Sequence, residues 1–294
     1  MSDYVLSCCS TADVEESFFQ EKNISCIFFH FELDGKQYID DLGKSMPFED
    51  FYRAMADGAM TRTSQPNRQE YFDYFEKFLK EGRDVLHFCL SSGISGALNS
   101  AETAAAELRE LYPDRKLYII DTLCASVSIA VMVDKAAEMR DAGATIDEVR
   151  DWMEEHKANC HTWFFVTDLT YLIRGGRVSK VSGFVAGMLG ICPLMNVNGE
   201  GKLSSIEKVR GRKRVVSRIV EIMKARCENG TDYDGKVYIS NSVCREDADG
   251  VANLIRANFP KVKGIFISSI GTTIGSHTGP GTVAVCFWGD KREH

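Results

Sequence analysis

Three short segments of the chain carry side chains that could bind a small anion. They occupy residues 63–66, 91–96 and 271–281, and they combine serine and threonine hydroxyls, glycine and one histidine, His277. Hydroxyl groups can donate hydrogen bonds to an anion, and glycine lets a ligand approach backbone N–H groups closely. The residue types therefore predict a site for a small anionic head group that draws on three distant parts of the chain.

The segment at residues 91–96 follows an apolar run and precedes a helix predicted over residues 97–111. Ligands of α/β proteins bind outside the carboxyl ends of the strands, where the N–H groups of a following helix favour an anion. The Ser95 hydroxyl and the backbone at Gly96 are candidate contacts. The alternative is that Ser95 only caps the following helix, which serine does well.

The segment at residues 63–66 precedes a second helix, predicted over residues 67–80. Asn67 and Glu70 form a capping-box pair for this helix, which leaves the hydroxyls of Thr63 and Ser64 available for a ligand. Proline at position 66 fixes the turn. A plain capping loop is the alternative.

His277 lies beside two hydroxyl residues in a glycine-rich segment, where an imidazole could pair with a carboxylate as imidazolium or act as a base. We assign structural roles to four other histidines, which lie in strands or at helix ends: His30, His87, His156 and His161.

A catalytic interpretation competes with the binding interpretation. Ser95 lies in a Gly-Ile-Ser-Gly-Ala segment that is close to the G-x-S-x-G nucleophile motif, and Asp121 and His277 follow it in the chain order of α/β hydrolases. A serine hydrolase that uses Ser95, Asp121 and His277 is therefore the alternative function. A structural or regulatory protein with a vestigial pocket is a third possibility.

Apolar strand patterns alternate with amphipathic helix patterns, which predicts an α/β fold with a mainly parallel sheet in the first half and helices on both of its faces. In this half we expect strands at residues 4–9, 24–33, 85–90 and 117–120, with a hairpin after Asp34 into residues 37–39. The helices are expected at residues 14–21, 48–60, 67–80, 97–111, 125–142 and 146–157.

The pattern changes near residue 160. We expect strands at residues 162–166, 191–197, 203–209, 237–241, 265–268 and 282–288, and helices at residues 169–173, 181–189, 212–227 and 248–258. The expected organisation is one domain over residues 1–290 with two subdomains. The first comprises residues 1–160 plus the last strand at 282–288, and the second is a smaller α/β unit at residues 161–270.

Composition excludes several classes of protein. The chain has 294 residues and ten cysteines, but no C-x-x-C pair, so we expect buried reduced thiols. It also has no P-loop, no G-x-G-x-x-G segment after a strand and no H-E-x-x-H motif, so we expect no metal and no cofactor. No stretch is apolar enough for a membrane helix, and the first residues do not resemble a signal peptide. We therefore expect a cytoplasmic protein without a transmembrane segment.

The charge is unevenly distributed. The net charge is −7, which argues against general nucleic-acid binding, yet residues 174–214 contain nine Lys and Arg and only two acidic residues. Such a basic surface on an acidic protein suits an acidic protein partner or a phosphorylated ligand, and a solvated face without a partner is the alternative.

The segments resemble the motifs of one family, the DegV family of fatty-acid-binding proteins. Residues 63–66 match its TSQP motif, residues 91–96 its SSxxSG motif, residues 168–177 its DLxYLxxGGR motif and residues 275–281 its GxHxGPG motif. The four matches occur in the family's order and span most of the chain. Two positions differ from the family's usual pattern, since Cys192 stands where a lysine is common and residues 7–11 replace an aspartate-serine turn.

The resemblance implies a two-subdomain DegV-like fold that holds one long-chain, palmitate-like fatty acid, with the acyl chain in a tunnel between the subdomains. It implies that the carboxylate meets Thr63, Ser64, Ser95, Gly96 and His277. It also implies a carrier without catalytic residues that presents the fatty acid to a separate ATP-dependent kinase, which forms an acyl phosphate for lipid metabolism. The candidate docking residues for that partner are Arg174, Arg177 and Arg210.

Overall fold

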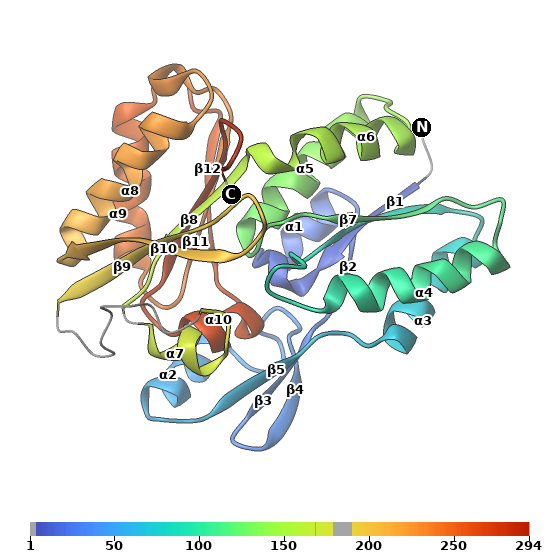
Figure 1. The fold of residues 1–294 in the computed structure, drawn as a ribbon, viewed down its shortest axis with the longest axis horizontal. Coiled ribbons are helices and arrows are strands. Elements are labelled where there is room, and N and C mark those ends of the chain that lie inside the picture. Colours follow the sequence, from blue (N-terminus) through green and yellow to red (C-terminus); the bar gives the residue numbers. More distant parts are fainter. Residues whose placement is uncertain (1–3, 168, 179–189, 294) are drawn as a thin grey trace.

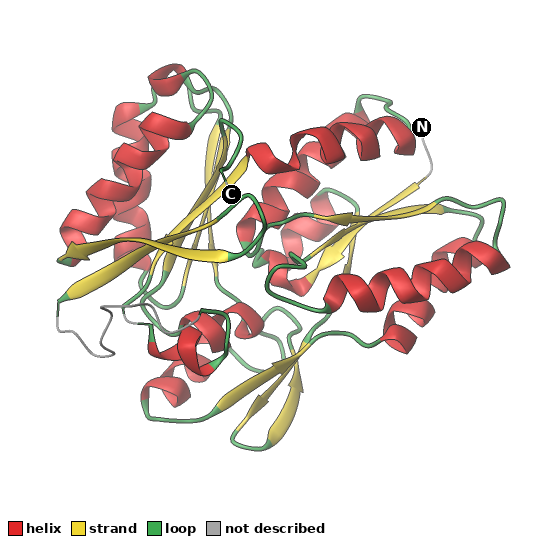
Figure 2. Ribbon diagram, in the orientation of Figure 1, coloured by secondary structure: helices red, strands yellow, loops and turns green. Residues whose placement is uncertain are grey.

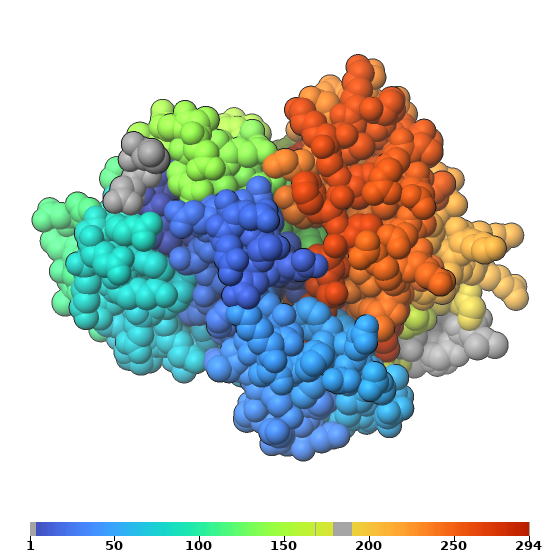
Figure 3. All heavy atoms as spheres, turned by 180° about the vertical axis from the view of Figure 1, so that it is seen from behind, coloured from blue at the N-terminus to red at the C-terminus, as the bar shows by residue number. Residues whose placement is uncertain are grey.

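The computed structural model describes residues 4–167, 169–178 and 190–293, and it contains two large β-sheets, a small one, and helices around them (Figure 1). Seen from behind, the earlier and later parts of the chain form two masses that meet along a groove (Figure 3). The helix expected at residues 181–189 and the first residue of the 168–177 motif lie outside the described residues.

The first large sheet has four strands in the order β2-β1-β6-β7, and all three pairings are parallel, as predicted. Helices α3 and α4 cover one face, and α5 and α6 cover the other (Figure 2). The strands are β1 (Tyr4–Cys9), β2 (Ile24–Ile27), β6 (Asp84–Cys89) and β7 (Leu117–Asp121). The helices of this half are α1 (Glu16–Glu21), α3 (Arg68–Lys80), α4 (Ala97–Leu111), α5 (Val127–Asp141) and α6 (Ile146–His156).

The second large sheet has six strands in the order β10-β9-β8-β13-β11-β12, with α8 (Arg212–Arg226) and α9 (Arg245–Asn258) packed on one face and α5 on the other (Figure 1). Only the β11–β12 pair is parallel among the described pairings. The strands are β8 (Cys160–Phe165), β9 (Ile191–Val197), β10 (Leu203–Arg210), β11 (Lys236–Asn241), β12 (Gly264–Ser269) and β13 (Val283–Trp288).

The position of β13 corrects one expectation. The last strand was expected to join the sheet of the first half, but it pairs with β8 and β11 inside the six-stranded sheet. Five of its six residues are buried, so the strand needs apolar cover on both faces. The centre of this sheet, between α5 and the α8–α9 pair, provides that cover.

Helix α5 joins the two large sheets. It packs against β1 of the first sheet and against β11 and β13 of the second. Its side chains are buried almost all the way round, which is typical of a helix enclosed on all sides rather than one lying on a surface. The two sheets therefore share one central helix.

The small sheet corrects two further expectations. Residues 24–33 form two strands rather than one, because β2 pairs with β1 whereas β3 (His30–Leu33) pairs with β4 (Lys36–Ile39) and β5 (Thr61–Ser64). The hairpin after Asp34 is confirmed, but β5 was not expected. Thr63 and Ser64 therefore lie on an edge strand instead of in a free turn. Helix α2 (Phe48–Ala56) precedes β5 along the chain.

The capping box of α3 gives a test of local stability. The Asn67 side chain accepts hydrogen bonds from the backbone N–H groups of Gln69 and Glu70, at 2.8 and 3.1 Å. Replacing Asn67 with alanine should lower the free energy of unfolding by about 1 kcal/mol, because two N–H groups lose their acceptor. Urea denaturation measures this difference. Asn67→Ser, which keeps a capping oxygen, should stay close to the wild type, and equal losses in both variants would contradict the assignment.

Candidate functional site

Two buried carboxyl groups hold the start of the helix that carries His277. The Gly271 N–H donates to Asp13 Oδ1 at 2.9 Å, and the Thr272 hydroxyl donates to Asp40 Oδ1, also at 2.9 Å. Residues 272–278 form helix α10 (Thr272–Thr278), although the sequence suggested a loop. Burial raises the pKa of both carboxyls, and for Asp13 the hydrogen bonds from Ser126 and Gly271 oppose that rise.

Helix α10 brings His277 against strand β5. His277 Nε2 and Thr63 Oγ1 are 2.8 Å apart, while the buried His277 Nδ1 has no hydrogen-bond partner among the described residues. We assign the proton to Nε2, because an unpaired buried N–H is rarer than an unpaired lone pair. Thr63 then accepts from His277, and the Thr63 hydroxyl hydrogen remains available to a ligand.

His277 is neutral at physiological pH. Burial lowers its pKa from 6.5 to about 4, and the nearby positive charge of Arg177 adds to the effect. The imidazole packs against the backbone of Gly175, where a Cβ atom would clash with His277 Nδ1. The imidazole therefore acts as a fixed hydrogen-bond donor, and the suggested imidazolium role does not fit its surroundings.

Ser95 lies one residue before the N-cap of α4, which is Gly96. Its hydroxyl oxygen accepts from the Ala97 N–H at 3.2 Å, and its own O–H faces Gln65 Oε1 at 3.3 Å. Gln65 also lies close to Gly96, where a Cβ would approach its side-chain oxygen to 3.0 Å. The segments at residues 63–66 and 91–96 are therefore in direct contact, and Gln65, which was not predicted, joins them.

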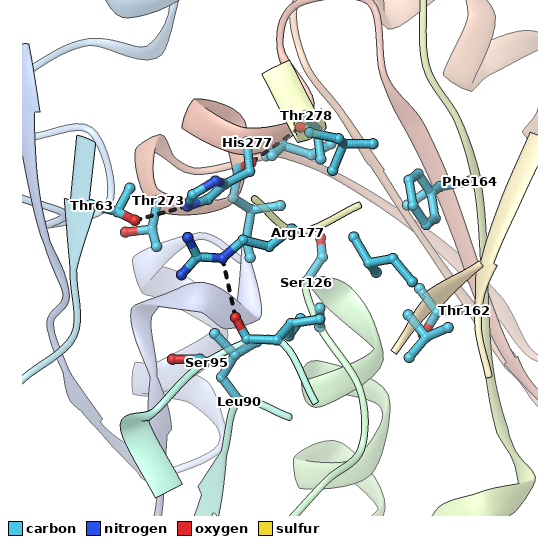
Figure 4. A pocket seen from close by; sticks show the side chains of 18 of the residues that line it. Thr63, Leu90, Ser95, Ser126, Thr162, Phe164, Arg177, Thr273, His277 and Thr278 are labelled. Atoms are coloured by element: carbon cyan, nitrogen blue, oxygen red, sulfur yellow. Dashed lines mark hydrogen bonds between the residues drawn. The ribbon is translucent and has the colours of Figure 1, made fainter. Parts of the chain in front are cut away.

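Arg177 lines the cavity beside His277 (Figure 4). Its Nε donates to the Ile94 carbonyl at 3.2 Å and its Nη1 to the Gly175 carbonyl at 2.7 Å. The sequence suggested a docking role for this residue together with Arg174 and Arg210. All three arginines are exposed, and Arg174 contacts the sulfur of Met60 and the ring of Tyr171. Sequence reasoning thus missed that Arg177 faces the cavity.

A cavity of about 330 Å³ lies where these residues meet, within the size range of small-molecule sites. Thr63, His277, Arg177 and Ser95 lie toward one end, and Phe164 and Thr162 toward the other (Figure 4). The described lining includes no acidic side chain. Apolar lining residues come from both halves of the chain: Phe29, Leu90, Ile94, Ala125, Phe164, Leu172, Val197, Leu203, Ile270, Ile274 and Ala284.

Several hydroxyl groups of the cavity lining are already used within the protein. Thr162 donates to the Ser128 hydroxyl at 2.8 Å, and Ser126 donates to Asp13 at 2.6 Å. Thr282 donates to the carbonyl groups of Thr278, the last residue of α10, and of Gly279. Because these hydroxyls are satisfied, the apolar end can hold a hydrocarbon without leaving polar groups unpaired. The cavity is amphipathic.

The hydrolase alternative is wrong. Asp121 accepts from the Ser92 hydroxyl at 2.5 Å and from two backbone N–H groups, whereas His277 bonds to Thr63. A triad needs a carboxylate that orients the histidine and a serine that bonds to it. Neither contact is present among the described residues.

Three further expectations concern the cysteines, the basic segment at residues 174–214 and membrane helices. All ten cysteines are free, and eight of them are buried, as predicted. The basic segment at residues 174–214 is partly neutralised, because Arg212 pairs with Asp247 and Lys202 pairs with Glu200. Within the described residues, none of the helices has the length and apolar character needed to cross a membrane.

Comparison with known proteins adds to this geometry. A family model described as "Uncharacterised protein, DegV family" matches residues 9–290. The chain belongs to the DegV family. A DegV domain-containing protein of Clostridium perfringens is 36% identical over 293 residues and covers 100% of both chains. A fatty acid-binding protein of Thermotoga maritima is 32% identical over 280 residues, 93% of each chain.

A solved structure of a DegV family member agrees with the fold. The crystal structure of a DegV lipid binding protein from Thermotoga maritima has a TM-score of 0.86 at 29% identity, and the match covers 100% of both chains. The α/β architecture with a parallel first sheet is therefore the DegV fold, as the four sequence motifs implied.

The pKa of His277 gives a test by pH. The unfolded protein holds a proton on this residue below about pH 6.5, whereas the folded protein accepts it only near pH 4. The free energy of unfolding should therefore fall as the pH is lowered from 6.5 to 4, and His277 accounts for about 3 kcal/mol of that fall. Denaturation of ligand-free protein at several pH values measures it.

His277→Gln is the comparison for this measurement, because glutamine keeps a side-chain N–H donor but does not titrate. The variant should lose less stability than the wild type over the same pH range. Parallel curves for the two proteins would show that His277 does not titrate with a lowered pKa.

Proposed function

We propose that this protein is a non-catalytic, cytoplasmic carrier that binds one long-chain fatty acid in the cavity and presents it to a separate kinase. The observation that carries the proposal is the amphipathic cavity, which has hydrogen-bond donors and one cation at one end and apolar side chains at the other. Two relatives, the fatty acid-binding protein and the lipid binding protein of Thermotoga maritima, support a lipid as the ligand.

The head group would lie among Thr63, Ser95 and Arg177. A buried carboxylate needs hydrogen bonds or a counter-charge. The Thr63 hydroxyl hydrogen is left available by the bond from His277, the Ser95 hydroxyl can turn from Gln65 to the ligand, and Arg177 supplies the positive charge. We further propose that Ser64 and the backbone at Gly96 contribute at the rim of this site.

The acyl chain would occupy the apolar end. Each methylene removed from water contributes about 0.8 kcal/mol, so a chain of palmitate length gains about 10 kcal/mol before the costs of binding. The lining comes from both halves of the chain, with Leu90 and Ala125 from the first and Phe164 and Val197 from the second. A ligand in this position would link the two halves.

The kinase would dock next to the polar end. Arg174 ends α7 (Thr170–Arg174), and this helix packs against α10, which carries His277. Arg210 ends β10, and its side chain is exposed. We propose that Arg174 and Arg210 contact the kinase, whereas Arg177 contacts the ligand. Phosphorylation of the bound carboxylate would then take place at this end of the cavity.

The head-group site can be tested by removing both hydroxyls. In protein purified from bacteria, the double variant Thr63→Ala with Ser95→Ala should retain fatty acid at least about tenfold more weakly, because two hydrogen bonds to a charged group are lost. Native mass spectrometry and analysis of extracted lipid measure the bound fraction.

Ser92→Ala is the matched control for this variant. Ser92 lies in the same turn, but its hydroxyl bonds to Asp121 and it does not line the cavity. Full retention is expected in the control. Retention in the double variant equal to the wild type would remove Thr63 and Ser95 from the head-group site.

The docking residues can be tested by charge reversal. Arg174→Glu with Arg210→Glu should leave fatty acid bound and should lower the rate of acyl phosphate formation with the ATP-using kinase subunit of the same organism, because like charges would face the partner. Arg256→Glu, at an exposed position of α9, makes the same kind of change away from this surface and should keep the normal rate. An unchanged rate in the double variant would place the docking surface elsewhere.

A further inference from the structure

Two neighbouring strands of the first sheet bring two cysteines and a histidine together in the core. His87 and Cys89 are two residues apart on β6, so their side chains point to the same face. Ser7 pairs with His87 in the parallel β1–β6 ladder, and Cys9 lies two residues further along β1, on the same face. All four side chains are fully buried, at 0% exposure.

The distances within this group match those of metal ligands. The Sγ atoms of Cys9 and Cys89 and a ring nitrogen of His87 all lie within 4.8 Å of one another. Cys9 Sγ and His87 Nε2 are 3.6 Å apart. A tetrahedral zinc site with usual bond lengths separates a cysteine sulfur from a histidine nitrogen by about 3.6 Å.

Neighbouring hydroxyl groups lie close to the three possible ligands. His87 Nδ1 lies 2.9 Å from the Ser7 hydroxyl, which in turn lies 2.7 Å from the Tyr74 hydroxyl. Metal-binding histidines almost always donate their other ring N–H to such a partner, which fixes the ring and its tautomer. On the opposite side, the Tyr71 hydroxyl lies 3.5 Å from the Cys9 sulfur and 4.0 Å from the Cys89 sulfur.

We propose that Cys9, His87 and Cys89 form a binding site for a thiophilic divalent ion of the Zn²⁺ class, with the Tyr71 hydroxyl on the fourth side. Each thiol releases its proton to solvent when the metal binds, so two thiolates and a neutral imidazole balance the two charges of the ion. This balance matters because an uncompensated charge in an apolar core is very unfavourable. The role is structural, since the site lies under α3 and away from the surface.

The site also connects to the cavity. Leu90 directly follows Cys89 and lines the cavity, and the turn that holds Ser95 begins one residue later. A metal at Cys89 would fix the end of β6 from which this turn departs. The inference does not depend on fatty-acid binding, because the metal ligands do not line the cavity.

Metal content tests the proposal directly. Protein purified under reducing conditions from cells supplied with Zn²⁺ should contain about one zinc ion per chain by mass spectrometry of elements. Cys9→Ser with Cys89→Ser should remove the zinc. Cys8→Ser is the matched control, because Cys8 is the neighbour of Cys9 on the opposite face of β1 and is equally buried. It should retain the zinc.

Two further measurements keep the test independent of how well the double variant folds. Wild-type protein stripped of metal and titrated with Co²⁺ should develop the near-ultraviolet charge-transfer absorption of cobalt–thiolate bonds. Ser7→Ala, which removes the partner of His87 Nδ1, should weaken Zn²⁺ affinity about 10–100-fold and leave the secondary structure unchanged.

Three outcomes would overturn the proposal. One is wild-type protein that binds neither Zn²⁺ nor Co²⁺. Another is zinc that remains in a folded Cys9→Ser, Cys89→Ser variant. The third is peptide mapping that finds Cys9 and Cys89 joined as a disulfide in metal-free protein from cells, since that would assign the cluster to thiol oxidation.

Discussion

The hydrogen bonds from the start of α10 to Asp13 and Asp40 are the contacts on which the site depends. Both carboxyls belong to the first half of the chain. Helix α10 belongs to the second half, where it follows strand β12. The bonds join the two halves at the start of a helix that lines the cavity. Asp13 also accepts from Ser126, which precedes α5, so one carboxyl fixes both α10 and the start of the helix shared by the two large sheets. These contacts help to hold His277 in position against Thr63.

The polar end of the cavity is organised to donate hydrogen bonds. His277 is buried and neutral, and its single ring proton is assigned to the bond with Thr63, which leaves the Thr63 hydroxyl hydrogen available. A protonated His277 would be a buried positive charge with the charge of Arg177 nearby, and the lowered pKa of His277 reflects this cost. The site therefore contains one cation and several neutral donors, which suits a single negative charge better than a doubly charged one.

Sequence reasoning succeeded where local chemistry decides the structure. The capping box at Asn67, the hairpin after Asp34 and the parallel first sheet all follow from short-range patterns. Sequence reasoning failed where contacts between distant segments decide the structure. Strand β13 joins the second sheet through its pairings with β8 and β11, and the start of α10 is held by Asp13 and Asp40, more than 200 residues away. The Cys9, His87 and Cys89 cluster has no sequence motif for the same reason, since Cys9 lies 78 residues from His87.

The placement of Arg177 shows why its role could not be deduced from charge alone. In the sequence it is one of nine basic residues in a single segment, and it does not differ from its neighbours. In the structure, two backbone carbonyls, of Ile94 and Gly175, hold its guanidinium at the cavity, whereas Arg212 is paired with Asp247. A carboxylate partner would compete with an anionic ligand for the charge of the arginine, but a carbonyl positions the side chain and leaves that charge uncompensated. Within the described part of the chain, Arg177 therefore has carbonyl partners and no acidic one, which is the arrangement that the proposed head-group site needs.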